Sequence, residues 1–248
     1  MHSNPDPAAP ELSIVVEPFT PELAAMSARA FVEELLIGSL GAKIVVVGEN
    51  FRFGRGREGD LALLGALGHE LGFDARALDL VGDDQGPYSS SRIRAAIRTG
   101  DLAEAERLLG RPHAVSGVVM AGAGRGRTIG VPTANLRDVE EAVPADGVYA
   151  CLVDHVLADG TARRLASGVA NIGARPTVDE GFAVEVHLFD FDRDIYGERL
   201  RLHLVSRLRD VKRFESLEAL KHQIQKDMTL ARRTTESRTP DPSATGWY

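Results

Sequence analysis

A glycine- and arginine-rich stretch leads directly into a threonine and an asparagine near the middle of this chain. Residues 122–136 read Gly-Ala-Gly-Arg-Gly-Arg-Thr-Ile-Gly-Val-Pro-Thr-Ala-Asn-Leu. Glycines let backbone N–H groups approach a polyanion closely, and arginines add positive charge at the same place. A threonine hydroxyl and an asparagine carbonyl oxygen are hard ligands that can reach one Mg²⁺ ion. These features indicate a site for a nucleotide and its metal. The candidate nucleotide-binding residues are Gly122, Gly124, Arg125, Gly126, Arg127, Thr128, Gly130, Thr133 and Asn135, and the last two are the candidate metal ligands.

Composition alone leaves a second interpretation of residues 122–136 open, namely a flexible exposed turn. A Rossmann fingerprint would open a helix, and Pro132 follows the glycines too soon for that. A Walker A loop would contain Gly-Lys-Ser/Thr, which this stretch lacks. A phosphate site at residues 122–136 therefore requires supporting residues elsewhere in the chain.

A carboxylate within an apolar strand is the second candidate for chemistry. Glu185 lies in Val-Glu-Val-His-Leu, and the alternation around it predicts a strand over residues 183–191. Phosphoryl transfer to a hydroxyl requires a nucleotide cradle, a metal and a base that orients the attacking oxygen. Glu185 is a candidate for that base, because a carboxylate among apolar residues is costly unless it has a purpose. A glutamate on the solvated face of an edge strand is the alternative.

The front part of the chain alternates helices and strands, which indicates an α/β fold. Helical periodicity covers residues 23–36 and 60–71, and apolar strands are predicted over 43–47 and 75–81. The continuous apolar run of the first strand is typical of a strand buried on both faces of a parallel sheet. The polar loop over 48–54 follows this strand, and ligands bind at the carboxyl ends of such strands.

Serines and arginines begin the next predicted helix. Residues 89–94 read Ser-Ser-Ser-Arg-Ile-Arg, and the helix continues to about Thr99. Hydroxyls and arginines at a helix start suit a phosphate, although a serine cap on a solvated basic helix explains the same residues. An aspartate with a glutamate three residues later predicts a further short helix over 101–110.

From residue 113 onward the pattern changes to strands. Alternating apolar residues predict a small closed or sandwich-like β domain, followed by a helix that Ser216 caps. Residues 1–10 and 234–248 lack periodicity and are predicted to be disordered. The predicted strands cover residues 115–120, 147–156, 164–172, 183–191 and 199–208.

The overall composition excludes several classes of protein. The content of 44% hydrophobic and 26% charged residues is typical of a globular domain, and the net charge of −7 argues against general nucleic-acid binding. Residues 1–10 lack the basic and apolar segments of a signal peptide, and no apolar run approaches the roughly 20 residues of a membrane helix. We expect a cytoplasmic protein that binds neither membranes nor nucleic acid. Its single cysteine, Cys151, lies in an apolar run and is expected to be a buried structural thiol.

Several motifs follow one another in the back part of the chain. In order, they are residues 124–136, Asp-Gly-Val-Tyr at 146–149, Gly-Val-Ala-Asn-Ile-Gly at 168–173 with Arg-Pro-Thr at 175–177, 185–188, Asp-Ile-Tyr-Gly at 194–197 and 208–214. With these motifs, residues 111–233 resemble riboflavin kinase. The resemblance implies a six-stranded β-barrel with a C-terminal helix, Mg²⁺ and ATP at Thr133 and Asn135, and riboflavin and FMN as substrate and product. It further implies that Glu185 is the base that acts on the ribityl 5′-hydroxyl, and that Arg209 and Phe214 bind the flavin.

The front part of the chain carries four further motifs, at residues 18–24, 31–36, 47–54 and 89–94. With these motifs, residues 1–110 resemble the second half of the FMN adenylyltransferase module of bacterial bifunctional FAD synthetases. The resemblance implies a partial Rossmann-like nucleotidyltransferase module. It also implies a flavin site at Asn50, Phe51, Arg52 and Phe53 and an ATP phosphate site at Ser90, Ser91, Arg92 and Arg94.

One element of that module has no counterpart in this sequence. The family module opens with Gly-x-Phe-Asp-Gly-x-His-x-Gly-His, and no two of the seven histidines here have that spacing. We therefore expect a riboflavin kinase whose adenylyltransferase activity is lost, and whose incomplete module exposes apolar surface that favours self-association. A fully bifunctional enzyme and a non-catalytic flavin-binding module are the alternatives. The predicted domains are residues 1–110 and 111–233, with a tail over 234–248.

Overall fold

Polar side chains begin the helices at the positions that the sequence predicts. Helices α3 (Leu61–Leu71), α4 (Ser90–Thr99) and α5 (Leu102–Leu109) each follow an Asp or Ser cap. In all three, the cap side chain accepts a hydrogen bond from the backbone N–H three residues later. Each cap thereby satisfies an N–H group that the helix itself leaves without a partner.

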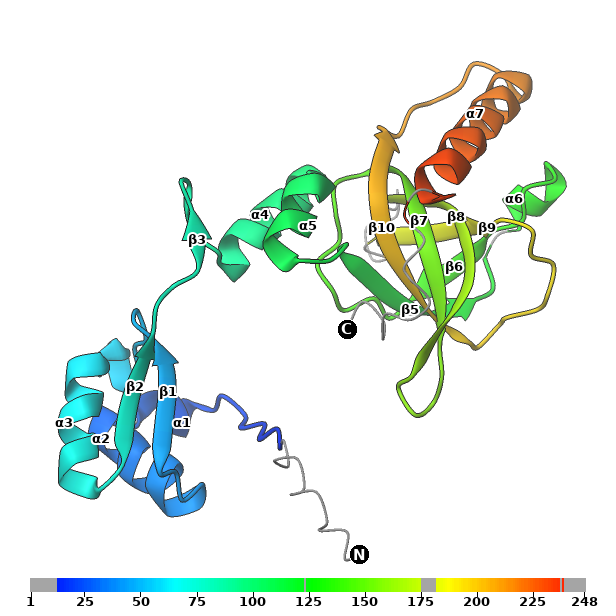
Figure 1. Ribbon diagram of the computed structural model, residues 1–248. Helices are drawn as coiled ribbons and strands as arrows, with labels where there is room; N and C mark the ends of the chain where they lie inside the picture. Colours follow the sequence, from blue (N-terminus) through cyan, green and yellow to red (C-terminus); the bar gives the residue numbers. More distant parts are fainter. Residues whose placement is uncertain (1–12, 123, 175–181, 237, 239–248) are drawn as a thin grey trace, which may run out of the picture. The chain divides into compact units, whose positions relative to one another are not determined.

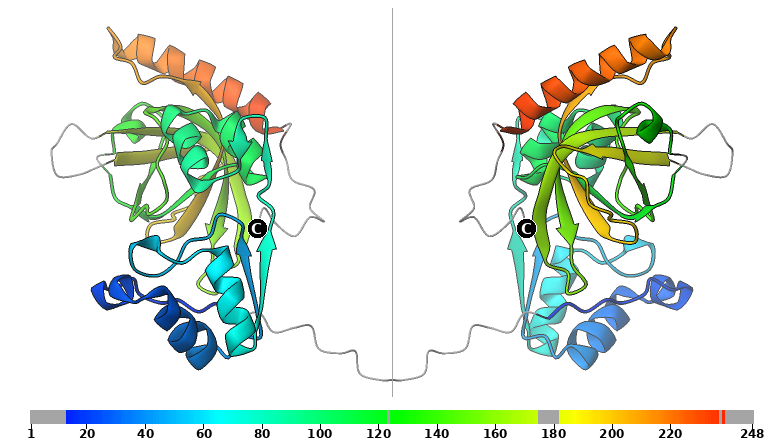
Figure 2. Two further views of the ribbon diagram at one scale, coloured as in Figure 1. Left: turned by 90° about the vertical axis from the view of Figure 1, so that its left-hand side faces the viewer. Right: turned by 90° about the vertical axis from the view of Figure 1, so that its right-hand side faces the viewer.

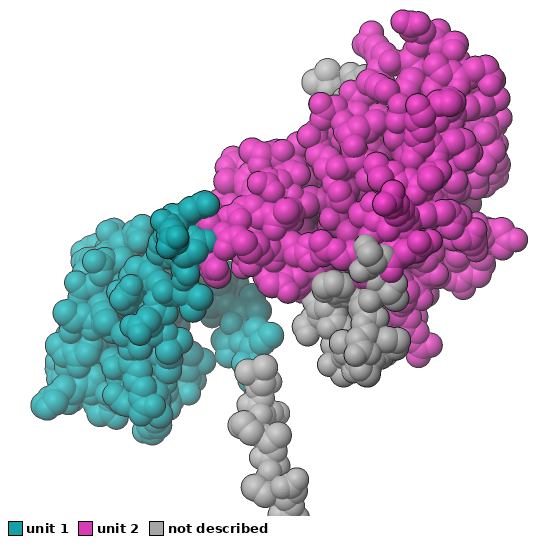
Figure 3. Space-filling model, turned by 45° about the horizontal axis from the view of Figure 1, so that its top comes forward, with its two compact units in different colours: residues 1–87 teal, residues 88–248 magenta. Residues whose placement is uncertain are grey.

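The structure is a computed structural model, and it describes residues 13–122, 124–174, 182–236 and 238 (Figure 1). The chain forms two compact units, residues 1–87 and 88–248 (Figure 3). This division falls earlier than the domain limit predicted at residue 110, because it groups α4 and α5 with the second unit. The predicted domains over 1–110 and 111–233 remain a prediction.

The first unit contains a small parallel sheet with helices on one face. Strand β1 (Ile44–Gly48) pairs with β2 (Asp74–Leu78), so that Val45 lies opposite Ala75. Their side chains pack with those of the helices into one apolar core. The remaining elements of this unit are α1 (Pro21–Ala25), α2 (Ala28–Ala30), the π-helical η1 (Phe31–Ser39), the 3₁₀ turn η2 (Arg55–Arg57), β3 (Gly82–Asp83) and β4 (Gly86–Pro87).

Two predictions for this unit are wrong in detail. The helix predicted over 23–36 is interrupted, because the Ser27 hydroxyl accepts a hydrogen bond from the Ala30 N–H and starts a new helix. The first strand is buried on one face only. Ile44 and Val46, which alternate with buried Val45, are 51% and 50% exposed.

The second unit is built on a closed barrel of six antiparallel strands, as predicted. The strand order is β10-β5-β6-β9-β8-β7, and the pairing of β7 with β10 closes the barrel. Alternate residues of each strand fill the interior with aliphatic side chains. The strands are β5 (Ala114–Met120), β6 (Ala134–Arg137), β7 (Gly147–Val156), β8 (Ala162–Ala174), β9 (Phe182–Leu188) and β10 (Arg199–Arg209), and a short helix α6 (Arg125–Thr128) precedes β6.

The C-terminal helix lies against the outside of this barrel (Figures 1 and 2). Helix α7 (Leu217–Glu236) packs on β7, β8 and β10, and Ala231 meets Ala150 and Phe189 in the contact. The helix continues through residues 234–236, so the predicted disordered tail is wrong for these three residues. The predicted disordered residues 1–10, the Arg-Pro-Thr motif at 175–177 and the tail over 239–248 lie outside the described residues.

The single cysteine has the structural role that its sequence context predicts. Cys151 is fully buried in β7, among the aliphatic side chains of the barrel interior. Burial raises the pKa of its thiol to about 12, so the reactive thiolate is suppressed. Within the described residues, no helix has the length and apolar content that crossing a membrane requires.

A buried carboxylate links three strands of the barrel wall. Asp154 on β7 accepts hydrogen bonds from Arg164 Nε on β8 at 2.7 Å and from His203 Nε2 on β10 at 2.9 Å. Asp154 and His203 are only 5% and 2% exposed. Burial alone would raise the pKa of Asp154, but the bonds from His203 and Arg164 outweigh burial and lower that pKa.

Replacement of Asp154 by Asn should lower the free energy of unfolding by about 3 kcal/mol, because it removes the buried carboxylate that accepts from His203 and Arg164. Because the pKa of Asp154 is lowered on folding, its stabilisation should be fully present above about pH 4 and lost as pH falls through the folded-state pKa. Urea unfolding across this pH range measures both effects. Glu218→Gln, at a side chain 81% exposed on α7, is the matched control. If the difference in the free energy of unfolding between Asp154→Asn and the parent chain does not decrease in acid, the stabilising role of the Asp154 carboxylate is contradicted.

Candidate active site

The predicted metal ligand and the predicted base lie directly opposite each other on neighbouring strands. Asn135 on β6 is in register with Glu185 on β9. Directly opposed residues in an antiparallel pair have Cβ atoms about 4.5–5.5 Å apart. Leu136, Val184 and Val186 point into the barrel core, so Asn135 and Glu185 point outward. Strand pairing therefore brings together two predicted site residues that are 50 positions apart in sequence.

Two glycines let the loop before β6 approach this pair closely. A Cβ atom at Gly122 would overlap the side chain of Asn135. A Cβ atom at Gly126 would overlap the backbone of Val131 and lie 3.3 Å from Oγ1 of Thr133. The loop therefore requires glycine at both positions to pack against the two predicted metal ligands.

The rest of the loop is a single helical turn between two glycines. Gly124 and Gly130 flank α6 with φ values of 68° and 79°, in the left-handed region that favours glycine. Arg127 and Thr128 lie on α6 and are exposed, while Arg125 is described by its backbone alone. Backbone N–H groups of this turn bond within it, as from Arg127 to the Gly124 carbonyl oxygen, so the exposed Arg127 side chain is its group for contacting an anion.

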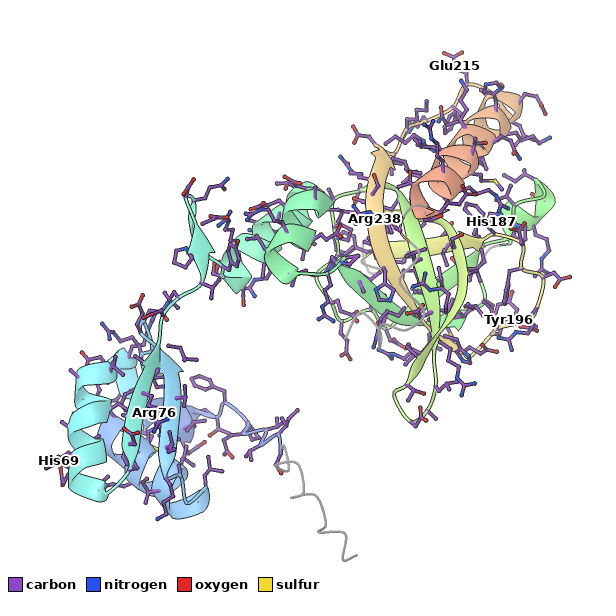
Figure 4. All side chains as sticks on the ribbon, in the orientation of Figure 1. His69, Arg76, His187, Tyr196, Glu215 and Arg238 are labelled. Carbon is purple, nitrogen blue, oxygen red and sulfur yellow. The ribbon has the colours of Figure 1, made fainter. Side chains whose placement is uncertain are left out.

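A cavity of about 430 Å³ opens beside Thr133. Arg127 and Thr133 line it from the loop, Val186 and Leu188 line it from β9, and Asp194–Tyr196 line it from the segment after β9. Figure 4 labels Tyr196 on the segment that connects β9 to β10. The cavity joins the glycine loop to the Asp-Ile-Tyr-Gly motif, and its volume is typical of small-ligand sites. Among the described residues of its lining, neither Asn135 nor Glu185 appears, because both face outward from the barrel.

His187 is a site residue that our sequence reasoning missed. Its Nδ1 atom lies 2.8 Å from the carbonyl oxygen of Pro132, so the ring donates a hydrogen bond there (Figure 4). This bond ties the residue before Thr133 to the strand that carries Glu185. The available signal was the period-2 alternation, which places His187 on the same outward face as Glu185.

The two residues predicted to bind flavin in the barrel lie together at the end of β10. The Arg209 guanidinium lies over the ring of Phe214, with 5.7 Å to the ring centroid. It also donates to Asp227 on α7, with 2.8 Å from Nη2 to Oδ2. Lys212 Nζ lies 5.2 Å from the same ring centroid. Helix α7 therefore fixes the geometry of this cation–aromatic cluster.

Of the four front flavin residues, Phe51 and Phe53 form part of the core of the first unit. Phe53 is 5% exposed, and Phe51 stacks on it with 5.4 Å between ring centroids. Asn50 lies at the exposed turn after β1, and Arg52 makes a loose 3.8 Å ion pair with Asp60. Phe53 thus supports the fold of this loop, and the more exposed Asn50 and Arg52 remain the accessible candidates.

The predicted front phosphate residues lie at the start of α4, in the second unit. Ser90, Ser91 and Arg94 are exposed. Arg92 instead makes a 2.8 Å ion pair with Glu104 of α5, where it is 17% exposed. The two groups of front-site residues therefore belong to different units.

Comparison with known proteins agrees with the motifs and the barrel. A family model described as riboflavin kinase matches residues 109–235, and one described as FAD synthetase matches residues 12–92. The bifunctional riboflavin kinase/FMN adenylyltransferase of Escherichia coli (strain K12) is 43% identical over 216 residues, which cover 86% of this chain and 67% of that protein. The chain belongs to the bifunctional riboflavin kinase/FMN adenylyltransferase family.

Two further similar proteins cover nearly the same share of the chain. The Haemophilus influenzae protein of that name is 39% identical over 223 residues, which cover 88% of this chain and 70% of the relative. A crystal structure described as a macrolide-efflux protein from Streptococcus pneumoniae is 35% identical, with a TM-score of 0.74. The match covers 86% of this chain and 67% of that one. The predicted family and the predicted riboflavin kinase barrel are thus confirmed.

Substitution of Gly122 by Ala should raise the KM for ATP about tenfold, because the new Cβ atom would displace the side chain of Asn135. The KM for riboflavin should change little. Steady-state kinetics with each substrate varied in turn measures this difference. Gly65→Ala is the matched control, because a Cβ atom at this helical glycine meets no atom within 4 Å. An unchanged KM for ATP in Gly122→Ala would remove Gly122 from the nucleotide site.

Proposed function

We propose that this chain transfers the γ-phosphate of ATP to the ribityl 5′-hydroxyl of riboflavin and so makes FMN. The observation that carries the proposal is the register of Asn135 with Glu185, beneath a glycine loop that leads to Thr133. A metal-binding amide, a carboxylate and an anion-binding turn next to one another are the parts that phosphoryl transfer to a hydroxyl requires.

The metal of this reaction is Mg²⁺ bound with ATP. The Thr133 hydroxyl and the Asn135 carbonyl oxygen are hard oxygen donors, which suit Mg²⁺ together with nucleotide phosphates. The close approach of Gly122 to the Asn135 side chain, which a Cβ atom would overlap, brings the glycine loop to this candidate ligand and supports the assignment. Bound Mg²⁺ would neutralise negative charge that develops on the phosphates during transfer.

Glu185 acts as the base that accepts the proton of the 5′-hydroxyl. Within the described residues, no side chain forms an ion pair with its carboxylate, and its direct neighbour across β6 is the uncharged Asn135. A carboxylate that is not held in an ion pair can orient the hydroxyl and take its proton as the new phosphorus–oxygen bond forms. The aliphatic side chains of the barrel interior fix the strand beneath it.

Replacement of Glu185 by Gln should lower kcat about a thousandfold, because the amide cannot accept the proton that the carboxylate accepts. Nucleotide affinity should be largely retained, since Thr133 and Asn135 hold ATP without help from this carboxylate. Turnover assays measure kcat, and calorimetric titration of a non-hydrolysable ATP analogue measures nucleotide affinity. Glu215→Gln, at an exposed glutamate near the start of α7 (Figure 4), is the control. Near-normal turnover in Glu185→Gln would exclude the base role.

The same chain makes little or no FAD. The sequence has no pair of histidines with the family spacing, and Arg92 of the expected phosphate site is held by Glu104. Chromatography of a reaction with riboflavin, ATP and Mg²⁺ tests both halves of the proposal. FMN alone supports it, FMN with FAD supports a fully bifunctional enzyme, and tight flavin binding without product supports a non-catalytic module. We further propose that the chain is cytoplasmic and does not bind nucleic acid, as its composition predicts.

The first unit mediates self-association with a second copy of this chain. Ile44, Val46 and Leu78 share the sheet face opposite the helices and are 51%, 50% and 59% exposed. Asp74 lies on the same face in a 2.7 Å ion pair with Arg76, which Figure 4 labels. A face with apolar residues and both charges is self-complementary, since a twofold axis can place each arginine near the opposite aspartate.

Val46→Asp should shift the chain toward the monomer, because it adds a charge to the apolar part of this face. Size-exclusion chromatography with light scattering over a range of concentrations measures the mass. Leu230→Asp, at an apolar residue 47% exposed on α7, is the matched control and should leave the mass unchanged. A parent chain that stays monomeric, or an equal effect of both variants, would contradict this role of the sheet face.

A further inference from the structure

One row of outward-facing residues crosses five strands of the barrel through Glu185. Asn135 on β6 pairs with Glu185 on β9, and Glu185 pairs with Asn171 on β8. Asn171 pairs in turn with Val148 on β7, which pairs with Arg209 on β10. Strand pairing therefore places Asn135, at the nucleotide end of the proposed site, and Arg209, at its flavin end, in one row across the barrel.

The two ends of this row have different chemistry. Asn135 lies under the glycine loop, where ATP and Mg²⁺ are proposed to bind. Arg209 lies over Phe214, in the cation–aromatic cluster proposed to hold the flavin ring. Adjacent strands are about 4.8 Å apart, so Glu185 and Arg209 are separated by roughly 14 Å along the barrel surface. A substrate that reaches from one to the other would pass close to Asn171, which is exposed, whereas Val148 is covered by protein.

Asn171 is the polar residue between these two ends. Its side chain is exposed, and no hydrogen bond joins it to another side chain in the part of the chain that the structure describes. Its neighbour in the row, Val148, is 4% exposed and has no polar side-chain group. An amide can both donate to and accept from a hydroxyl, so Asn171 matches a polyol chain better than a carboxylate or an amine would.

We propose that Asn171 binds a hydroxyl of the polyol chain of the flavin substrate and thereby positions the terminal hydroxyl at Glu185. This inference rests on the proposed kinase function. Asn171 is a positioning residue, because it touches substrate but takes no part in proton or phosphoryl transfer. Its exposure argues against a role in barrel stability, since an exposed amide without protein partners adds little to folding.

Asn171→Ala should raise the KM for riboflavin about fivefold to tenfold, the effect of one lost neutral hydrogen bond. The KM for ATP and the melting temperature should not change. Asn171→Leu, which has a similar volume and no polar atoms, should behave in the same way. Arg163→Ala, at an exposed residue near the other end of β8, is the matched control and should leave both KM values unchanged.

A flavin analogue isolates the proposed contact. An analogue with a 5-hydroxypentyl chain in place of the ribityl chain keeps the terminal hydroxyl and lacks the others. The parent chain and Asn171→Ala should use this analogue with equal kcat/KM, because the analogue cannot make the contact that the variant removes. A penalty for Asn171→Ala that persists with the analogue overturns the proposal.

Two other outcomes are also decisive. A lower kcat with an unchanged KM for riboflavin would mean that Asn171 acts on Glu185 rather than on the polyol, and would overturn the inference. A parent chain that makes no FMN would instead refute the proposed kinase function. The two failures are therefore distinguishable in one set of assays.

Discussion

Strand register around the closed barrel is the constraint on which the rest of the kinase site depends. Side chains alternate between the two faces of a strand, so a shift of one residue would exchange every inward side chain for an outward one. Val184 and Val186 are 2% and 0% exposed in the barrel interior, which makes such a shift very unfavourable. The apolar core therefore fixes Glu185 on the outside of the barrel, opposite Asn135.

Five of the six strands of this barrel were predicted from sequence because each carries a clear local pattern, whereas the short β6 was not predicted. Alternation identified the inward residues of β9, and the helix starts predicted at residues 60, 89 and 101 are confirmed by Asp and Ser caps. The pairing of β6 with β9 was not predictable in this way, since 50 positions separate Asn135 from Glu185. His187 was missed for the same reason, because its bond to Pro132 exists only after those two strands have paired.

The errors in the first unit have a different physical cause. An apolar run in the sequence indicates that a strand has two apolar faces. It does not indicate how many helices or strands are present to cover those faces. Ile44 and Val46 look like buried residues in sequence and are half-exposed on a sheet of two strands. Likewise, Phe53 sits in a polar loop by composition, yet it packs into the core with Phe31 and Phe51.

Helix α7 links the stability of the barrel to the geometry of the proposed flavin end. Its Asp227 is 5% exposed and holds the Arg209 guanidinium, which in turn lies over Phe214. The ion pair between Arg232 of α7 and Asp190 is exposed, with Asp190 at 78%, so it contributes little to stability. The buried pair is different, because loss of either partner would leave an uncompensated charge beside the helix. Packing of α7 on β7, β8 and β10 is therefore coupled to the position of Arg209, at the end of the row that begins at Asn135.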